Sequence, residues 1–124
     1  MREILFRGRS MAQGSEWLYG DVLMYENSAQ IWETIDGRKH NSVVSIKTVG
    51  QYTGLTDKNG KKIFEGDICK HRSNYSGEYI ISAVTYTDGE FLAMVNENSG
   101  FSLSDKLEVI GNIHDNPELL KGGE

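Results

Sequence analysis

The residues best able to do chemistry are three histidines and one cysteine. His40, His71 and His114 lie far apart and lack the i, i+4 spacing of a helical zinc site. In an extended strand Cys69 and His71 would share one face, which supplies only half of a metal site. A single cysteine forms no internal disulfide, and we interpret Cys69 as a small buried side chain. We therefore predict no metal and no cofactor.

Closely spaced carboxylates offer a second kind of chemistry. Asp57, Asn59 and Glu65 resemble part of a calcium loop, but the glycine and glutamate fall at positions four and nine, and a calcium loop needs them at about six and twelve. Glu65 and Asp67 could share a strand face, where one raised pKa would suit acid–base catalysis. Gly66 between them favours a turn.

The sequence also lacks a phosphate loop, a dinucleotide fingerprint and a nucleophile elbow, so we predict that the chain is not an enzyme.

Cations and aromatic side chains gather in the middle of the chain. This combination is typical of proteins that bind single-stranded nucleic acid, whose bases stack on aromatic rings. Lysines that solvate a hairpin tip and aromatics that fill a core produce the same pattern, so both interpretations stay open. The candidate binding surface consists of Tyr52, Lys58, Lys61, Lys62, Lys70, His71, Arg72 and Tyr75.

Charge is unevenly distributed along the 124 residues, whose formal net charge is −5. Residues 1–50 are balanced, residues 51–72 carry five basic and three acidic side chains, and residues 73–124 carry two basic and nine acidic ones. An acidic surface repels phosphate backbones over about a Debye length. The last third therefore favours a basic or protein partner over broad nucleic-acid binding.

The elements that must position these residues are mostly β-strands. Fourteen glycines, a single proline, and short β-branched or aromatic runs separated by turn signals indicate a β barrel or meander. Asn59-Gly60 favours a type I′ hairpin turn, and Gly20 favours a bulge or bend. The predicted elements are strands over residues 3–7, 16–19, 21–25, 30–35, 43–46, 48–53, 62–64, 68–71, 78–87, 90–95, 101–103 and 107–113, and a short helix that begins at Pro117.

The length of 124 residues suits one compact unit or two small halves. We divide the chain into an N-terminal β meander over residues 1–53 and a second half over residues 54–124, with a structured joint near residues 53–67. No apolar run approaches the roughly 18 residues of a membrane span, and residues 1–9 lack the apolar core of a signal peptide. We expect a cytoplasmic protein that does not contact the membrane.

Residues 48–68 carry a family resemblance. They read Thr-Val-Gly-Gln-Tyr-Thr-Gly-Leu-Thr-Asp-Lys-Asn-Gly-Lys-Lys-Ile-Phe-Glu-Gly-Asp-Ile and closely resemble the signature of the YopX family of phage and prophage proteins. Residues 2–9, Glu16-Trp17, Gly20 and residues 109–120 match as well. Residues 27–47 match nothing in the family, and the Phe-Arg-Ala-Trp-Asp run of many members is replaced by Phe-Arg-Gly-Arg at residues 6–9.

The resemblance implies a mostly β protein from a bacteriophage or prophage, with an SH3-like barrel in its second half. It implies no biochemical activity. Our leading hypothesis is a phage accessory module that binds a host or phage protein through an acidic face of residues 73–124, with a barrel edge able to add an extended strand. The alternative is nucleic-acid binding through the basic strip, and a third is an enzyme with a site near Glu65, Asp67 or His71. Pairing of exposed strand edges would also allow a homo-oligomer.

Overall fold

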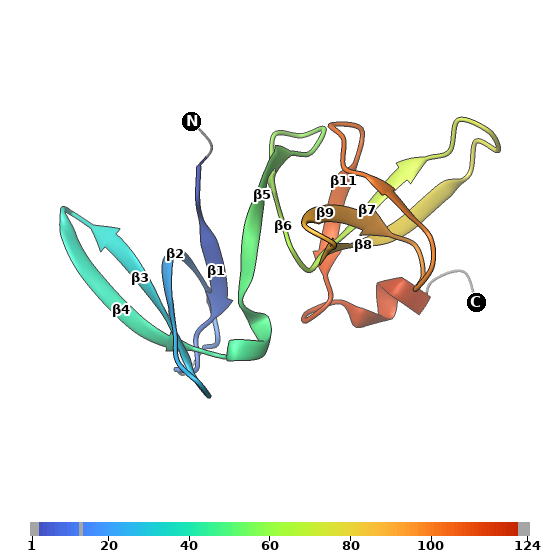
Figure 1. Cartoon of the computed structure of the whole chain (residues 1–124). Helices are drawn as coiled ribbons and strands as arrows, with labels where there is room; N and C mark the ends of the chain where they lie inside the picture. The colour runs from blue at the N-terminus through green and yellow to red at the C-terminus, as the bar shows by residue number, and fades with distance from the viewer. Residues whose placement is uncertain (1–2, 13, 122–124) are drawn as a thin grey trace. The chain divides into compact units, whose positions relative to one another are not determined.

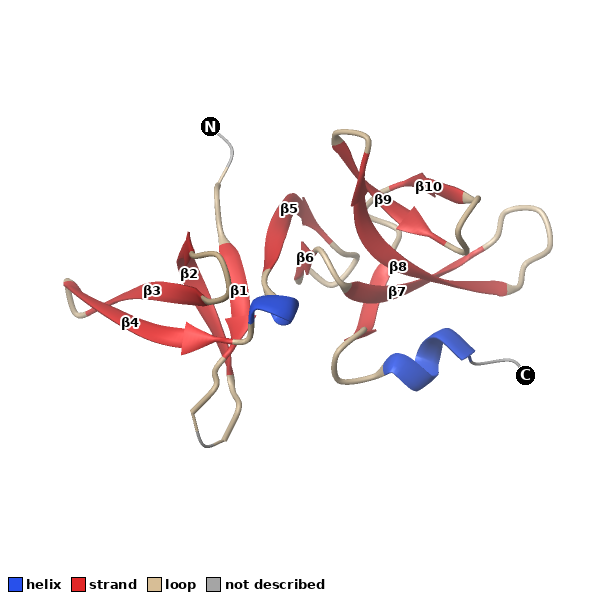
Figure 2. Cartoon of the chain, turned by 60° about the horizontal axis from the view of Figure 1, so that its bottom comes forward, coloured by secondary structure: helices blue, strands red, loops and turns tan. Residues whose placement is uncertain are grey.

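The computed structural model of the chain describes residues 3–12 and 14–121 and divides the chain into two compact units, residues 1–52 and 53–124. Antiparallel strands dominate both units, as Figure 1 and Figure 2 show. The elements are β1 (Phe6–Arg9), β2 (Trp17–Met24), β3 (Ala29–Ile35), β4 (Arg38–Val44), η1 (Ile46–Thr48), β5 (Gly50–Thr56), β6 (Lys62–Phe64), β7 (Asp67–Arg72), β8 (Tyr79–Thr87), β9 (Glu90–Met94), β10 (Gly100–Ser102), β11 (Glu108–Asn112) and η2 (Pro117–Lys121). No helical segment in the described part of the chain is long and apolar enough to cross a bilayer.

The first unit is organised by a change of partner within β2. Residues 17–20 of this strand pair with β1, and residues 21–24 pair with β3. A Cβ atom on Gly20 would collide with the carbonyl oxygen of Trp32, so only glycine fits where the partner changes. The predicted interruption at Gly20 is not formed, because β2 runs through this residue as one strand and only its partner changes there. The side chains that form the core of this unit are Leu18, Ala29, Ile31 and Val44, with Phe6, Val22, Ile46 and Val49 packed against them.

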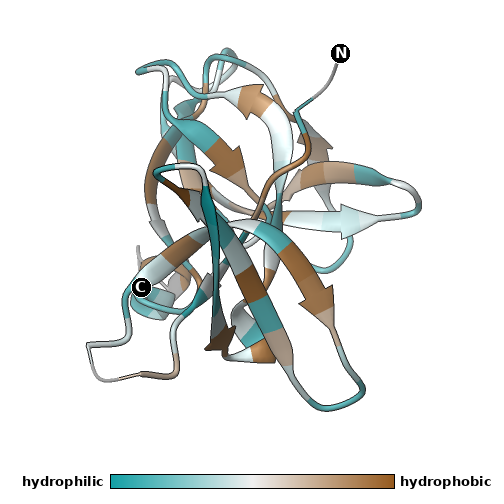
Figure 3. Cartoon of the chain, turned by 90° about the vertical axis from the view of Figure 1, so that its left-hand side faces the viewer, coloured by the Kyte–Doolittle hydropathy of each residue, from teal (hydrophilic) through white to brown (hydrophobic). Residues whose placement is uncertain are grey.

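The second unit is built on a five-stranded sheet with the order β10-β9-β8-β7-β11. Its central hairpin joins β8 to β9 through Asp88 and Gly89, both of which have positive φ, and this confirms the predicted hairpin. Hydropathy alternates along the strands because one face of each packs inward, while the turns are mostly hydrophilic (Figure 3). The buried core residues are Ile63, Cys69, Val84, Ala93 and Leu107.

The mostly β fold is confirmed, but the barrel prediction is wrong, because the described residues form no closed barrel. They form two open antiparallel sheets, and β10, at one edge of the five-stranded sheet, has only three residues. After β10, Leu103 packs against the core and Leu107 lies within it. These side chains cover the core although the sheet does not close. The SH3-like barrel implied for residues 54–124 is therefore not formed as a closed structure.

The predicted C-terminal helix is also corrected. Residues 117–121 form a 3₁₀ turn, η2, and not an α-helix. Only five residues lie between Asn116 and the glycine pair at positions 122 and 123 in the sequence. Nucleating an α-helix fixes several residues for the first hydrogen bond, and so short a stretch gives too few further bonds to offset that cost.

Candidate functional site

The structure separates the predicted strip of cations and aromatic rings into several places. Tyr52 lies in the first unit with only 8% of its surface exposed, so it is a core residue and not a platform for stacking. The remaining members lie in the second unit: Lys58, Lys61 and Lys62 in and beside the β5–β6 turn, His71, Lys70 and Arg72 on β7, and Tyr75 in the loop after β7.

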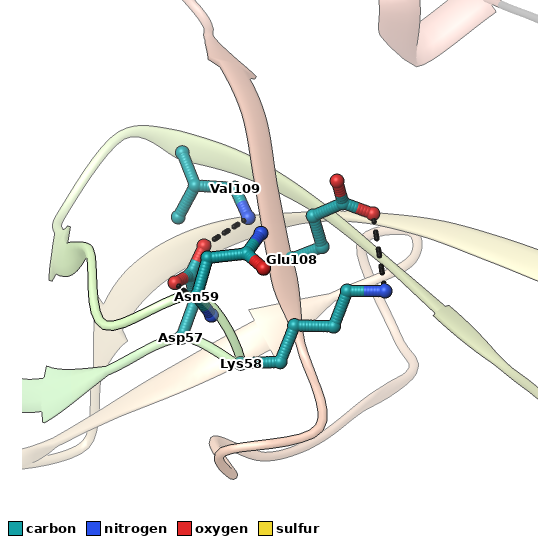
Figure 4. A network of polar contacts seen from close by, with 5 residues as sticks. All are labelled: Asp57, Lys58, Asn59, Glu108 and Val109. Carbon is teal, nitrogen blue, oxygen red and sulfur yellow. Dashed lines mark hydrogen bonds and ion pairs between the residues drawn. The ribbon is translucent and has the colours of Figure 1, made fainter.

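Asp57 ties the β5–β6 turn to β11 (Figure 4). Its Oδ1 accepts hydrogen bonds from the backbone N–H groups of Asn59 and Lys61, and its Oδ2 accepts one from Val109, each 2.9 Å long. The backbone N–H of Lys58 donates to Leu107 at 2.9 Å. The carboxylate therefore joins two segments that are 52 residues apart in the sequence.

These contacts also set the ionisation of Asp57. Burial alone would raise its pKa, but the backbone N–H groups of Val109, Lys61 and Asn59, and the positive charge of Lys61, outweigh burial. They hold the pKa of Asp57 below its usual value, because each of them favours the carboxylate over the neutral acid. The group is thus a charged structural acceptor at neutral pH.

The second pair of motif carboxylates also belongs to a turn. Asp67 is buried, and its Oδ2 accepts a hydrogen bond of 2.8 Å from the backbone N–H of Phe64. Gly66 has a φ of 92°, which favours glycine at this position. The backbone N–H of Gly66 donates to Val84 on β8. This geometry supports the interpretation of the Glu65-Gly66-Asp67 run as a turn.

Cys69 and His71 lie on the same strand but in different surroundings. Cys69 is fully buried, and burial together with the carboxylates of Asp67 and Asp57 raises the pKa of its thiol to about 12. His71 packs edge-on against Phe101 with ring centroids 4.5 Å apart. Among residues 3–12 and 14–121, no three histidine, cysteine, aspartate or glutamate side chains lie together in a way that could hold a metal ion.

Two cations of β7 meet at one tyrosine of β8. Arg72 pairs with Tyr79 and Lys70 pairs with Ile81 across the antiparallel strands, so all four side chains lie on one face of the sheet. Lys70 Nζ lies 4.9 Å from the centroid of the Tyr79 ring, and Arg72 Cζ lies 5.5 Å from it. Both distances are within the range of cation–π attraction. Tyr79 remains 60% exposed.

The loop between β7 and β8 presents a second tyrosine. Tyr75 is fully exposed. The loop beneath it is nevertheless ordered: Ser73 Oγ accepts hydrogen bonds from the backbone of Tyr75 and Ser76, and Arg72 Nε donates to the carbonyl oxygen of Gly77 at 2.7 Å. We name Lys70, Arg72, Tyr75 and Tyr79 the cation–tyrosine surface.

Comparisons with known proteins connect this fold to a family. A family model described as YopX protein matches residues 5–121. The chain belongs to the YopX family. It is also similar to the crystal structure of protein EF1440 from Enterococcus faecalis, with 26% sequence identity, a TM-score of 0.61, and coverage of 97% of this chain and 99% of that chain. A search of curated proteins gave no significant match.

Within this YopX-family chain, the signature run over residues 48–68 performs structural tasks. Asp57 holds the turn to β11, Gly60 has a φ of 83° in that turn, and Asp67 closes the next one. The cation–tyrosine surface begins directly after the run. Sequence reasoning found Lys70, Arg72 and Tyr75 but missed Tyr79, which strand pairing across the short loop of residues 73–78 would have placed opposite Arg72.

A comparable arrangement in the first unit is structural. The guanidinium carbons of Arg7 and Arg9 lie 4.6 and 4.9 Å from the ring centroid of Trp17, and Trp17 is directly opposite Arg9 in the register. Arg7 is only 5% exposed. Trp17 is therefore a cross-strand partner of Arg9, and the burial of Arg7 distinguishes this cluster from the exposed residues of the second unit.

Proposed function

We propose that this chain is a non-catalytic protein-interaction module which a phage or prophage supplies to the cytoplasm of its bacterial host. The polar groups of the family signature support a structural role. Asp57 and Asp67 accept backbone hydrogen bonds, and burial keeps the Cys69 thiol protonated. The binding function resides on the cation–tyrosine surface.

One observation carries this proposal: Tyr75 is fully exposed on a loop that its own hydrogen bonds hold in place. Tyrosine and arginine are enriched among the residues that dominate binding energy at protein interfaces. Because the loop is already ordered, it loses little conformational entropy when a partner covers it. An exposed ring on such a loop suits insertion into an apolar pocket of another protein.

Capture from a bacterial host lysate tests the proposal. The full-length protein and its Tyr75→Ala variant are immobilised, and retained proteins are identified by mass spectrometry. We expect at least one protein that the variant retains about tenfold less. Tyr25→Ala is the control, because Tyr25 is also an exposed tyrosine, 52% exposed, but lies in the first unit. If every retained protein binds the Tyr75→Ala bait as well as the wild type, the proposal is wrong.

The acidic face predicted for residues 73–124 would bind a partner in a different way from the cation–tyrosine surface, and it remains a prediction. In the structure, carboxylates of this segment lie in turns that follow several different strands, including Asp88, Glu97, Asp105 and Asp115. A basic partner held by these groups would be retained equally by the Tyr75→Ala bait and released by moderate salt. The same capture experiment therefore distinguishes the two modes.

Nucleic-acid binding is the second candidate function. It is favoured by the placement of Lys70 and Arg72 beside the exposed ring of Tyr79, with Tyr75 exposed on the loop that follows, a combination that suits backbone contacts and base stacking. The acidity of the segment that follows opposes it. A labelled oligothymidylate of about twelve nucleotides, followed by fluorescence anisotropy, tests this candidate. Binding below about micromolar concentration that weakens steeply with salt would replace our proposal.

A further inference from the structure

We infer that the cation–tyrosine surface takes one carboxylate, carried beside an apolar side chain on an extended segment of the partner protein. This inference rests on the proposed function and names the chemistry that the surface recognises. It starts from the charges around Tyr79. In the described part of the chain, neither Lys70 nor Arg72 forms an ion pair, although both lie on the same ring.

The nearest acidic residue in the register does not compensate these cations. Glu108 on β11 lies opposite Lys70, but its Oε1 pairs with Lys58 Nζ at 3.5 Å. The negative charge of Glu108 is therefore compensated in part by Lys58. Lys70 and Arg72 on β7 are left facing the neutral ring of Tyr79. Attraction to the ring compensates them only in part, since an exposed cation–π contact is worth about 0.5–1 kcal/mol. A carboxylate would complete the cluster.

Arg72 is oriented to receive such a group. Its Nε donates to the carbonyl oxygen of Gly77, which fixes the plane of the guanidinium. The two terminal nitrogens then remain on an exposed side chain and can bind both oxygens of a carboxylate. This fork geometry gives arginine its preference for planar oxyanions.

The apolar part of the ligand follows from the neighbouring strand. Ile81 lies opposite Lys70, two residues after Tyr79, and is partly exposed on the same face. An extended segment whose carboxylate reaches Arg72 would place a neighbouring side chain near Ile81. Burial of that side chain adds an attraction that does not depend on salt.

Charge decides between a peptide and a nucleic acid. Residues 53–124 carry seven basic and twelve acidic side chains. A polyanion would bring many charges into this negative field, within a Debye length of about 8–10 Å. A single carboxylate brings one charge and meets two cations at contact distance. The observations therefore favour an acidic residue in a peptide segment.

Selection from a displayed library of random peptides tests the inference. The library is first depleted on the Lys70→Gln/Arg72→Gln variant, which keeps most of the length of both side chains, and then selected on the wild-type protein. We expect the enriched peptides to share one aspartate or glutamate next to an apolar residue. Changing that acid to its amide should weaken binding about tenfold, and the Lys70→Gln/Arg72→Gln variant should weaken it at least as much.

The control is Arg38→Gln/Lys106→Gln, which removes one arginine and one lysine from other exposed positions and should bind the peptides like the wild type. Thermal unfolding of each variant shows that it is folded. The inference is wrong if the enriched peptides lack a shared acid, or if their amide forms bind equally well. If such peptides nevertheless bind the Tyr75→Ala variant more weakly than the wild type, the inference is wrong but the proposed function is still supported. If the selected peptides bind all of these variants as well as the wild type, both the inference and the proposed function are wrong.

Discussion

Removal of the Asp57 carboxylate should destabilise the second unit, because the carboxylate joins the β5–β6 turn to β11. Asp57→Ala deletes three hydrogen bonds of 2.9 Å, two within the turn and one to Val109 of β11. The side chain is 4% exposed, so solvent does not compete strongly for its oxygens. The turn would lose its connection to β11, and β11 pairs with β7.

The magnitude follows from these three bonds. A hydrogen bond to a charged group contributes about 1.5–3 kcal/mol, but the amides of Asn59 and Lys61 lie in an exposed turn and regain water. We therefore expect a loss of about 3 kcal/mol, dominated by the bond to Val109. For a unit of this size, each kcal/mol shifts the unfolding midpoint by about 4–8 °C, so the expected decrease is about 12–24 °C.

Asp57→Asn keeps the shape of the side chain but removes its negative charge. Its amide oxygen can still accept from Asn59 and Lys61, but its NH₂ group would face the N–H of Val109, and we expect a loss of about 2 kcal/mol. Because the folded pKa of Asp57 is lowered, its stabilisation is complete above the unfolded pKa near 3.8 and is lost as the pH falls through the folded pKa. The difference in stability between wild type and Asp57→Asn should therefore shrink in acid.

The assay is thermal unfolding of the full-length protein, combined with hydrogen exchange at the Val109 amide. Asp105→Ala is the control, because Asp105 is exposed in the same unit. We expect faster exchange at Val109 in both Asp57 variants and wild-type behaviour in the control. An unchanged midpoint and unchanged exchange in Asp57→Ala would refute the reasoning.

Three further predictions concern single residues. Full burial and a thiol pKa of about 12 make Cys69 unreactive, so a thiol reagent at pH 8 should label it only in denaturant. Rapid labelling of the native protein would contradict its burial. Gly60→Ala should lower the free energy of unfolding by about 1 kcal/mol, as measured by chemical denaturation. The whole loss should come from the φ of 83°, since nothing lies within 4 Å of an added Cβ. An unchanged stability would mean that residue 60 does not have this positive φ in the folded protein. Lys58→Ala should change stability by less than about 1 kcal/mol, because the Lys58 side chain is 53% exposed and solvent screens its ion pair with Glu108. A larger loss would show that this pair is structurally important.

Local sequence signals were sufficient for several elements. Asp88-Gly89 predicted the β8–β9 hairpin, and Gly20 marked a special position in β2, although a change of partner lies there and not the predicted bulge or bend. In both cases the backbone itself requires the residue type, through a positive φ or a close approach. The positive φ of the Asp88-Gly89 turn is a local requirement that can be read from the sequence, whereas the close approach of Gly20 to Trp32 depends on strand pairing.

Long-range closure could not be read in this way. Alternation along the strands is the same in a barrel and in an open sheet, and the difference lies in whether the edge strands pair. Here Leu107 fills the core where the sequence suggested only a strand start. The candidate site was partly missed for a similar reason, because the pairing of Arg72 with Tyr79 is set by the length and hydrogen bonding of the loop between them.

The structural role of the family signature and the proposed binding surface are connected through β11. Asp57 fixes Val109, Val109 pairs with Cys69, and Cys69 directly precedes Lys70 on β7. The signature thus holds in place the strand that carries Lys70 and Arg72, while the exposed loop with Tyr75 follows that strand. A rigid strand beneath an ordered loop limits the entropy lost on binding, which favours a defined partner over nonspecific association. Under our proposal, the signature determines where the surface lies, and the residues after it determine which partner the surface binds.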